Sequence, residues 1–357
     1  MNQRTSQLFP LPKDLSTHRY RMEVRRMQVE TLSSSLSQDL PIGADSVYWQ
    51  LVTPQAGKKW MRKDSPLLRP VNAVKFLTRS TCAYSIGSCF AVNINLWLRY
   101  QGFDLPDVSW GIHYNSRTIL YELRRAAGLS APSVDWRIRK SDGSEAYDDP
   151  LRHCVDASSL DELAQTKHRA TMDSRRVFES ADAFFITLGL SDIWEASIGD
   201  ETIVLNRAPY LGAEILGQST EVGIENRFLT VEECMDDLRQ IARIIRERKP
   251  ANTPIVFSVS PTPLKHAGGS YHPQVANSRS KATLLAAMFG FLDECADDPA
   301  ISYFPAYEFF QTNPMGIDLW QADERHPSHD AVNHVAEAFL SGYSSESISI
   351  RPGFIGI

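Results

Sequence analysis

The chain has 357 residues, of which 43% are hydrophobic and 22% are charged, and its formal net charge is −6. This composition is typical of a folded globular protein and excludes collagen, extended coiled coils and wholesale disorder. The acidic balance, with lysine and arginine scattered along the chain, predicts that nucleic acid is not a partner.

The N-terminal residues 1–45 are polar and rich in serine. We expect a polar extension there, either partly ordered or carrying a charged, partner-binding helix over 19–30. We expect no secretory signal, because the start of the sequence has no apolar core, and no membrane span, because no apolar stretch is long enough to cross a bilayer. The five cysteines are widely spaced without a C-x-x-C pair, which is typical of reduced thiols and predicts a cytoplasmic protein without a metal site.

Four short apolar stretches end in turn residues, which is typical of strands buried on both faces. Amphipathic helical patterns lie between or after them. The alternation predicts an α/β fold, a three-layer α/β/α sandwich with a mainly parallel sheet, over 46–345, followed by a tail over 346–357. The expected strands are 83–86, 183–188, 255–259 and 301–304, and the clearest helices are 231–248, 278–297 and one after Pro327.

Functional groups are expected at the carboxyl ends of these strands, where α/β folds place their sites. The segment 193–230 follows one strand end and shows no clear core element. Long loops in such places usually form a lid or a binding wall. A surface insertion without a role is the alternative.

Asp323 stands three residues before His326, just ahead of Pro327. A carboxylate at this spacing can accept a hydrogen bond from one imidazole nitrogen and leave the other free as a base. Pro327 favours an extended backbone at His326, which would let the ring project from a loop. A solvated helix start would also explain the pair.

The turn around Gly87 could supply a nucleophile. Gly87 permits a sharp turn from a strand into a helix, and Ser88 and Cys89 follow it. A hydroxyl or thiol at a helix N-terminus gains from the helix dipole, and backbone N–H groups there can hold an oxyanion. The alternative is an ordinary turn with a buried cysteine.

Together these segments resemble the GSCFA branch of the SGNH/GDSL hydrolase superfamily, and the five letters of that branch stand here at 87–91. The similarity extends from about Val47 to Phe339. It includes 109–111 with Tyr114 and Arg117, 186–194, 259–264, Asn277, Ser278, Ser280 and Lys281, 303–308, and 323–326.

This resemblance implies an SGNH/flavodoxin-like fold with a catalytic Ser or Cys, a His and an Asp. Members of the superfamily remove or transfer acyl groups on sugars and lipids. We therefore expect an acyl-ester hydrolase, an esterase or O-deacetylase acting on a carbohydrate or related metabolite, with no cofactor. The alternatives are an O-acyltransferase in polysaccharide or lipid modification, and an inactive relative that binds a glycan or a protein.

The superfamily pattern places the nucleophile two residues after the glycine that closes the first strand. This count favours Cys89, whereas residue type favours Ser88. The usual asparagine of the third block is replaced by Ser191 and Asp192, so the implied oxyanion donors are Gly111, Asn115, Gly189 and Ser191.

Candidate substrate-binding residues lie further along the chain. Aromatic rings could stack on a sugar, and basic groups could hold a polar or anionic part of the substrate; core packing and solvated positions are the alternatives. These candidates are Trp194, His266, His272, Lys281 and Tyr307.

Overall fold

The computed structural model describes residues 69–139, 143–153, 155–209, 214–215 and 222–355. The extension expected over 1–45, and the start of the main domain at 46, lie outside these residues.

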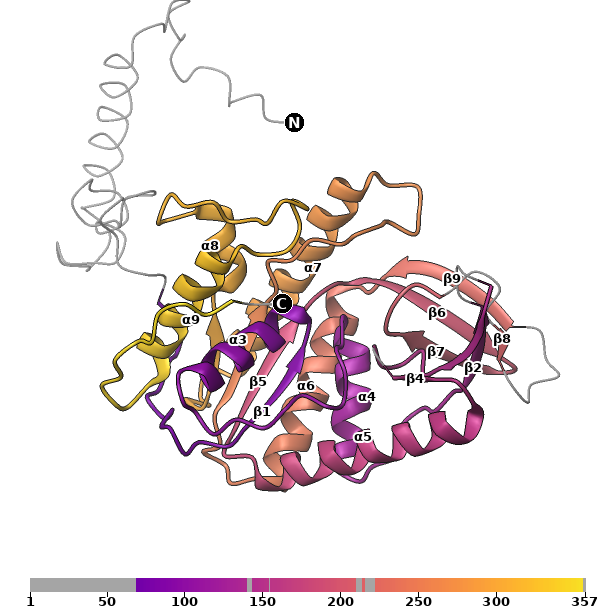
Figure 1. The fold of residues 1–357 in the computed structure, drawn as a ribbon, viewed down its shortest axis with the longest axis horizontal. Helices are drawn as coiled ribbons and strands as arrows, with labels where there is room; N and C mark the ends of the chain where they lie inside the picture. Colours follow the sequence, from indigo (N-terminus) through magenta and orange to yellow (C-terminus); the bar gives the residue numbers. More distant parts are fainter. Residues whose placement is uncertain (1–68, 140–142, 154, 210–213, 216–221, 356–357) are drawn as a thin grey trace, which may run out of the picture. The chain divides into compact units, whose positions relative to one another are not determined.

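A parallel sheet of four strands forms the centre of this part of the chain (Figure 1). Its order is β1 (Ala83–Gly87), β5 (Ala183–Leu188), β10 (Ile255–Val259) and β11 (Ile301–Phe304). All four expected strands are confirmed. Successive side chains point to opposite faces. Every residue of the four strands is buried, so both faces of the sheet are covered.

Helices cover both faces of the sheet, so the predicted three-layer arrangement is confirmed. Tyr84 and Ile86 of β1 share a core with one set of helices, whereas Ala83 packs with the other set. The first set is α4 (Ser116–Ala126), α5 (Leu160–Ser180), α6 (Val231–Arg248) and α7 (Pro273–Glu294), and the second is α3 (Cys89–Tyr100), α8 (Ala306–Thr312) and α9 (His329–Tyr343).

Helix α7 begins earlier than the expected residue 278. Its first residue is Pro273, preceded by His272 as N-cap. Proline is well suited to the first position of a helix, because its missing N–H would have no partner there and its φ is already helical.

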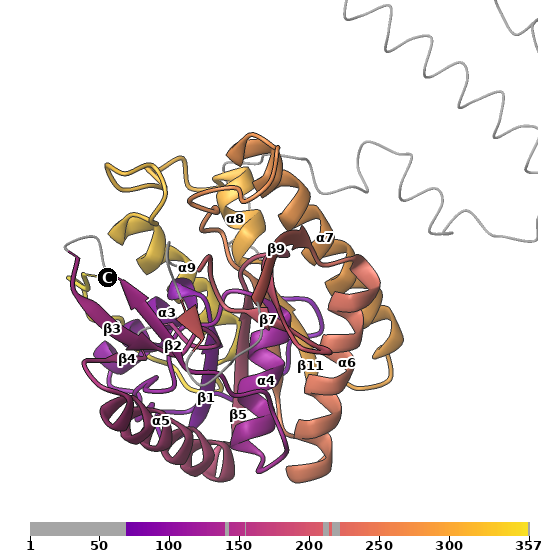
Figure 2. The same ribbon diagram turned by 90° about the vertical axis from the view of Figure 1, so that its right-hand side faces the viewer.

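Two small antiparallel sheets lie to one side of the parallel sheet in Figure 1, and this side faces the viewer in Figure 2. One has the order β7–β6–β9 and the other β4–β3–β2–β8, and they share a core that includes Trp136, Ala196 and Leu205. Their strands are β2 (Trp136–Arg139), β3 (Glu145–Asp148), β4 (Asp156–Ala157), β6 (Asp192–Ile198), β7 (Glu201–Leu205), β8 (Glu214–Ile215) and β9 (Val222–Phe228).

The expectation that 193–230 holds no core element is therefore wrong. The strands there bury only one face, so apolar side chains are interrupted by exposed polar ones; Ile193 and Ala196 are buried while Ser197 is exposed. Such short, one-sided strands leave a weaker pattern than the continuous apolar stretches of the parallel sheet.

Segments at both ends of the described chain pack on this core. Val71 exchanges two backbone hydrogen bonds with Tyr303 of the edge strand β11, at 2.8 and 3.1 Å. Within the tail, Phe354 is buried in the core that α3, α8 and α9 share, and Pro352 O accepts from the Tyr100 hydroxyl at 2.6 Å. None of the described helices is both long enough and apolar enough to cross a bilayer.

Candidate active site

The strand-to-helix turn after β1 requires glycine. Gly87 has a φ of +138°, and a Cβ placed on it would lie 2.1 Å from the carbonyl oxygen of Thr187 on the adjacent strand. Ser88 then caps α3, since its hydroxyl accepts a hydrogen bond from the backbone N–H of Phe90 at 3.3 Å. The next residue, Cys89, is the first of the helix.

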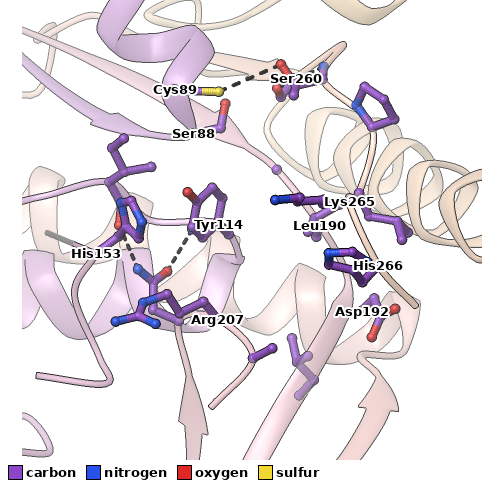
Figure 3. Close-up of a pocket in the computed structure, with 18 of the residues that line it drawn as sticks. Ser88, Cys89, Tyr114, His153, Leu190, Asp192, Arg207, Ser260, Lys265 and His266 are labelled. Atoms are coloured by element: carbon purple, nitrogen blue, oxygen red, sulfur yellow. Dashed lines mark hydrogen bonds between the residues drawn. The ribbon is translucent and has the colours of Figure 1, made fainter. Parts of the chain in front are cut away.

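Cys89 projects toward the loop that follows β10 (Figure 3). Its Sγ donates to Thr262 Oγ1 at 3.8 Å, and its side chain is partly exposed. The first N–H groups of a helix have no acceptor inside the helix. The sulfur lies at the positive end of the helix dipole. Two of these donors, the N–H groups of Phe90 and Ala91, are already bonded to Ser88.

A cavity of about 490 Å³ opens at the carboxyl ends of β1, β5 and β10. It is lined partly by loops that follow the parallel strands and partly by the antiparallel sheets. The loops after the parallel strands contribute Ser88, Cys89, Thr262, Lys265, His266, Arg325 and His326 to its wall. The antiparallel sheets and the residues directly after β7 contribute Trp194, Asn206 and Arg207.

His326 is held by Asp323, as expected from their spacing. Nδ1 of His326 lies 2.5 Å from Asp323 Oδ2. Asp323 Oδ1 accepts from the backbone N–H groups of His326 at 2.9 Å and Arg325 at 3.0 Å, and these bonds lower the pKa of Asp323 to about 2. The carboxylate is therefore ionised at any pH at which the protein would work.

Arg325 contacts the other ring nitrogen of His326, Nε2. Its Nη2 lies 3.0 Å from His326 Nε2, and its Nη1 donates to Pro263 O at 3.4 Å. A guanidinium can only donate, so Nε2 must be the accepting, unprotonated nitrogen. This is the tautomer that a general base needs, with Nδ1–H directed at Asp323.

The candidate oxyanion donors separate into two groups. Gly189 lines the cavity, whereas Asn115 and Ser191 lie outside it and their donors are used elsewhere. Asn115 caps α4 and donates through Nδ2 to Leu205 O at 2.9 Å; Ser191 donates its N–H and its hydroxyl to Ser280. Gly111, with a φ of +92°, packs against His153 O outside the cavity wall. An oxyanion role for these residues stays a prediction.

The candidate substrate-binding residues are also divided. Trp194 and His266 line the cavity. His272 instead caps α7, and Tyr307 packs beside the core. Lys281 lies behind the cavity wall, fully buried and bonded to three carbonyl oxygens.

Several cavity residues had no motif to indicate them. Asn206 and Arg207 fall in a segment that showed no core pattern, and Asn206 donates to Ile112 O at 2.6 Å. Thr262 and Arg325 do lie within the family-like stretches, but only their position beside Cys89 and His326 indicates what they contact. Within the described ranges, no group of three His, Cys, Asp or Glu is placed to hold a metal ion.

A family model described as GSCFA family matches residues 83–339. The match begins at β1 and ends within α9, so it includes the whole parallel sheet and the segments that carry Cys89, Thr262 and His326. Comparisons with curated proteins and with solved structures found no match.

Proposed function

The chain belongs to the GSCFA family, and from this premise we propose that it is an SGNH-type acyl-ester hydrolase with Cys89 as nucleophile. One observation carries the proposal. The same cavity receives a thiol at a helix N-terminus and an imidazole that is paired with an ionised carboxylate. Nucleophile, base and orienting carboxylate are the three parts of the acyl-transfer triad.

Cys89 is favoured over Ser88 by what each side chain contacts. The Ser88 hydroxyl is turned back to cap its own helix, and the residue as a whole is only 3% exposed. The Cys89 sulfur faces the Thr262 hydroxyl across the cavity wall. This agrees with counting two residues from Gly87 in the superfamily pattern.

The proposed reaction begins when Arg325 leaves His326 Nε2, which then takes up the proton that Cys89 gives up, either directly or through solvent. The thiolate attacks the acyl carbonyl, and the backbone N–H of Cys89, at the first position of α3, is the donor that we propose for the oxyanion. The alcohol leaves with the proton from His326, and a thioester remains on Cys89. His326 next deprotonates a water that attacks the thioester, which releases the carboxylic acid and restores the thiol.

A carbohydrate ester or related metabolite is the substrate class that we propose. The cavity is in the size range of small-molecule sites, and its wall carries Trp194, whose indole could stack on a sugar ring. The cytoplasm is the proposed location, because a partly exposed cysteine nucleophile needs a reducing environment to stay a thiol.

Transfer to a second alcohol instead of water is the second candidate function, and it is supported by the same residue. A thioester on Cys89 could react with an acceptor hydroxyl that excludes water from the cavity. Turnover that requires an added acceptor would identify an acyltransferase. Binding of a sugar without any turnover would identify an inactive relative.

The nucleophile is tested by hydrolysis of p-nitrophenyl acetate and by the intact mass of the protein after mixing. We expect Cys89→Ala to abolish both turnover and the mass increase of one acetyl group. Ser88→Ala is the matched control; it should lose about 1 kcal/mol of stability with the helix cap and keep most of its turnover. Activity that survives in Cys89→Ala and disappears in Ser88→Ala would identify a serine enzyme instead.

The base is tested separately. His326→Ala and Asp323→Ala should each lower kcat by roughly 10³-fold, and the double variant should be little worse than either, because the two residues act as one unit. Asp330→Ala, an exposed carboxylate at the start of α9, is the control and should leave kcat unchanged. Full activity in a folded His326→Ala protein would refute the assignment.

A further inference from the structure

Lys281 is a fully buried lysine in the middle of α7. Its Nζ donates to the carbonyl oxygens of Gly189 at 2.7 Å, Ser260 at 2.7 Å and Thr262 at 3.0 Å. These carbonyls belong to the loops that follow β5 and β10, and all three residues line the cavity. The amino group therefore lies directly behind the cavity wall.

The three acceptors indicate that this group is an ammonium. An ammonium has three N–H donors, one for each carbonyl, whereas a neutral amine has two and would turn its lone pair toward the third oxygen. Burial lowers the pKa of Lys281 to about 7, and a negative charge on Cys89 opposes this by raising it. The hydrogen bonds favour the charged form.

A buried ammonium normally needs a counter-ion, because removing a charge from water is costly. Among the described residues, no carboxylate lies within ion-pair distance of Lys281, and the one titratable group that influences it is Cys89. Thr262 connects the two groups. Its carbonyl accepts from Lys281, and its hydroxyl meets the Cys89 sulfur at 3.8 Å.

We propose that Lys281 is a positioning residue whose buried ammonium holds Cys89 as a thiolate, with Thr262 between them. The S–H bond of Cys89 breaks, its proton leaves to solvent, and the thiolate becomes the counter-ion that the ammonium lacks. The Thr262 hydroxyl then reverses its role: it accepts from the thiol, but donates to the thiolate. The catalytic consequence rests on the proposed function, whereas the thiolate itself needs no substrate.

The test is the rate at which iodoacetamide alkylates Cys89 between pH 5 and 9.5, read by mass spectrometry of the peptide that contains it, so that the other cysteines do not interfere. A free cysteine ionises near pH 8.5. In the wild type, we expect half of the maximal rate at pH 7 or below. In Lys281→Met the midpoint should move up by at least one pH unit, which means about 10-fold slower labelling at pH 6.

Lys265→Met is the matched control, because it removes a lysine charge from the rim of the same cavity where solvent screens it. Its midpoint should stay within a few tenths of a unit of the wild type. If Lys281→Met and the wild type give the same midpoint, Lys281 is only a structural clamp and the proposal is wrong.

A reciprocal measurement covers the case in which Lys281→Met does not fold. With ¹⁵N-labelled lysine, the Nζ resonance of Lys281 should lose its proton at a pH at least one unit lower in Cys89→Ala than in the wild type, because the counter-charge is gone. An unchanged titration would overturn the proposal. A low midpoint for alkylation combined with no ester turnover would instead retain the thiolate and reject the hydrolase.

Discussion

At the scale of single residues, Arg325 blocks the atom through which His326 would act. Its guanidinium caps Nε2 at 3.0 Å and is tied to Pro263 O. Proton transfer at Nε2 therefore requires the guanidinium to move away. A substrate with a carboxylate or phosphate would favour this movement, since these groups match the fork of an arginine.

Arg325→Ala should accordingly increase the hydrolysis of a small neutral ester such as p-nitrophenyl acetate by several-fold, because the base is no longer occupied. The measurement is kcat/KM of the purified enzyme at a fixed pH. Arg351→Ala is the control: it removes an arginine of the tail whose guanidinium lies over the ring of Tyr100, and it should have no effect. A loss of 10-fold or more would show that Arg325 helps catalysis instead of obstructing it.

The sequence predicted the pairing of Asp323 with His326 because a three-residue spacing is local. It also predicted that Cys89, or its neighbour, would stand at a helix start. It could not predict that Lys281 is buried or that Asn115 is used as a cap. Those facts depend on which carbonyls and N–H groups distant segments bring near each side chain.

At the scale of secondary-structure elements, the approach of β1 to β5 controls where α3 begins. The two strands are paired up to Gly87 and Thr187, and no space for a side chain remains at Gly87. A larger residue must push the turn away from β5 and carry Cys89 with it.

Gly87→Ala should therefore destabilise the fold by about 3 kcal/mol or more, as a strained backbone adds to a direct collision. Gly143→Ala is a matched control: its φ is +83°, but among the described residues no atom beyond its chain neighbours lies within 4 Å of the added Cβ. It should cost only about 1 kcal/mol for the left-handed conformation. Denaturant unfolding measures both, and equal losses would show that strain, not the contact with Thr187, limits this turn.

The parallel strands were predictable at this scale because each is apolar along its whole length. The antiparallel strands were not, since β6 mixes buried residues with half-buried and exposed ones, only the last three residues of β7 are buried, and the two strands depend on each other for a shared core. The cavity wall that contains Trp194 and Asn206 was missed for the same reason.

At the scale of the whole molecule, a buried charge cluster links α4 to the chain before α5. Glu122 is fully buried and accepts from Arg152 at 2.7 and 3.0 Å and from Arg125 at 3.3 Å. Burial alone would raise the pKa of Glu122, but the two arginines outweigh it and lower the pKa to about 2. His113 lies beside this cluster, 3.9 Å from Glu122.

His113 should make the protein sensitive to acid. Burial lowers the pKa of His113 from 6.5 to about 4. Between pH 4 and pH 6.5, His113 is protonated in the unfolded chain but not in the folded one. The free energy of unfolding therefore has its highest value above pH 6.5 and falls by up to about 3 kcal/mol as the pH drops to 4. Urea unfolding across this range should show the loss in the wild type.

His113→Phe should flatten that part of the profile, because the group that must remain neutral is gone. His168→Phe replaces an exposed histidine and should keep the wild-type dependence. The same slope in both variants would show that other groups cause the acid sensitivity.

The backbone exchange between Val71 and Tyr303 has a consequence for solubility. β11 is the last strand of the parallel sheet, and an edge strand offers unpaired N–H and C=O groups to any neighbouring chain. The two hydrogen bonds to Val71 cover that edge at Tyr303, in the middle of the strand. The residues around Val71 thus protect β11 from edge-to-edge pairing with another chain. A shortened chain that begins after Val71 would expose this edge and aggregate more readily, although it would keep every residue of the cavity.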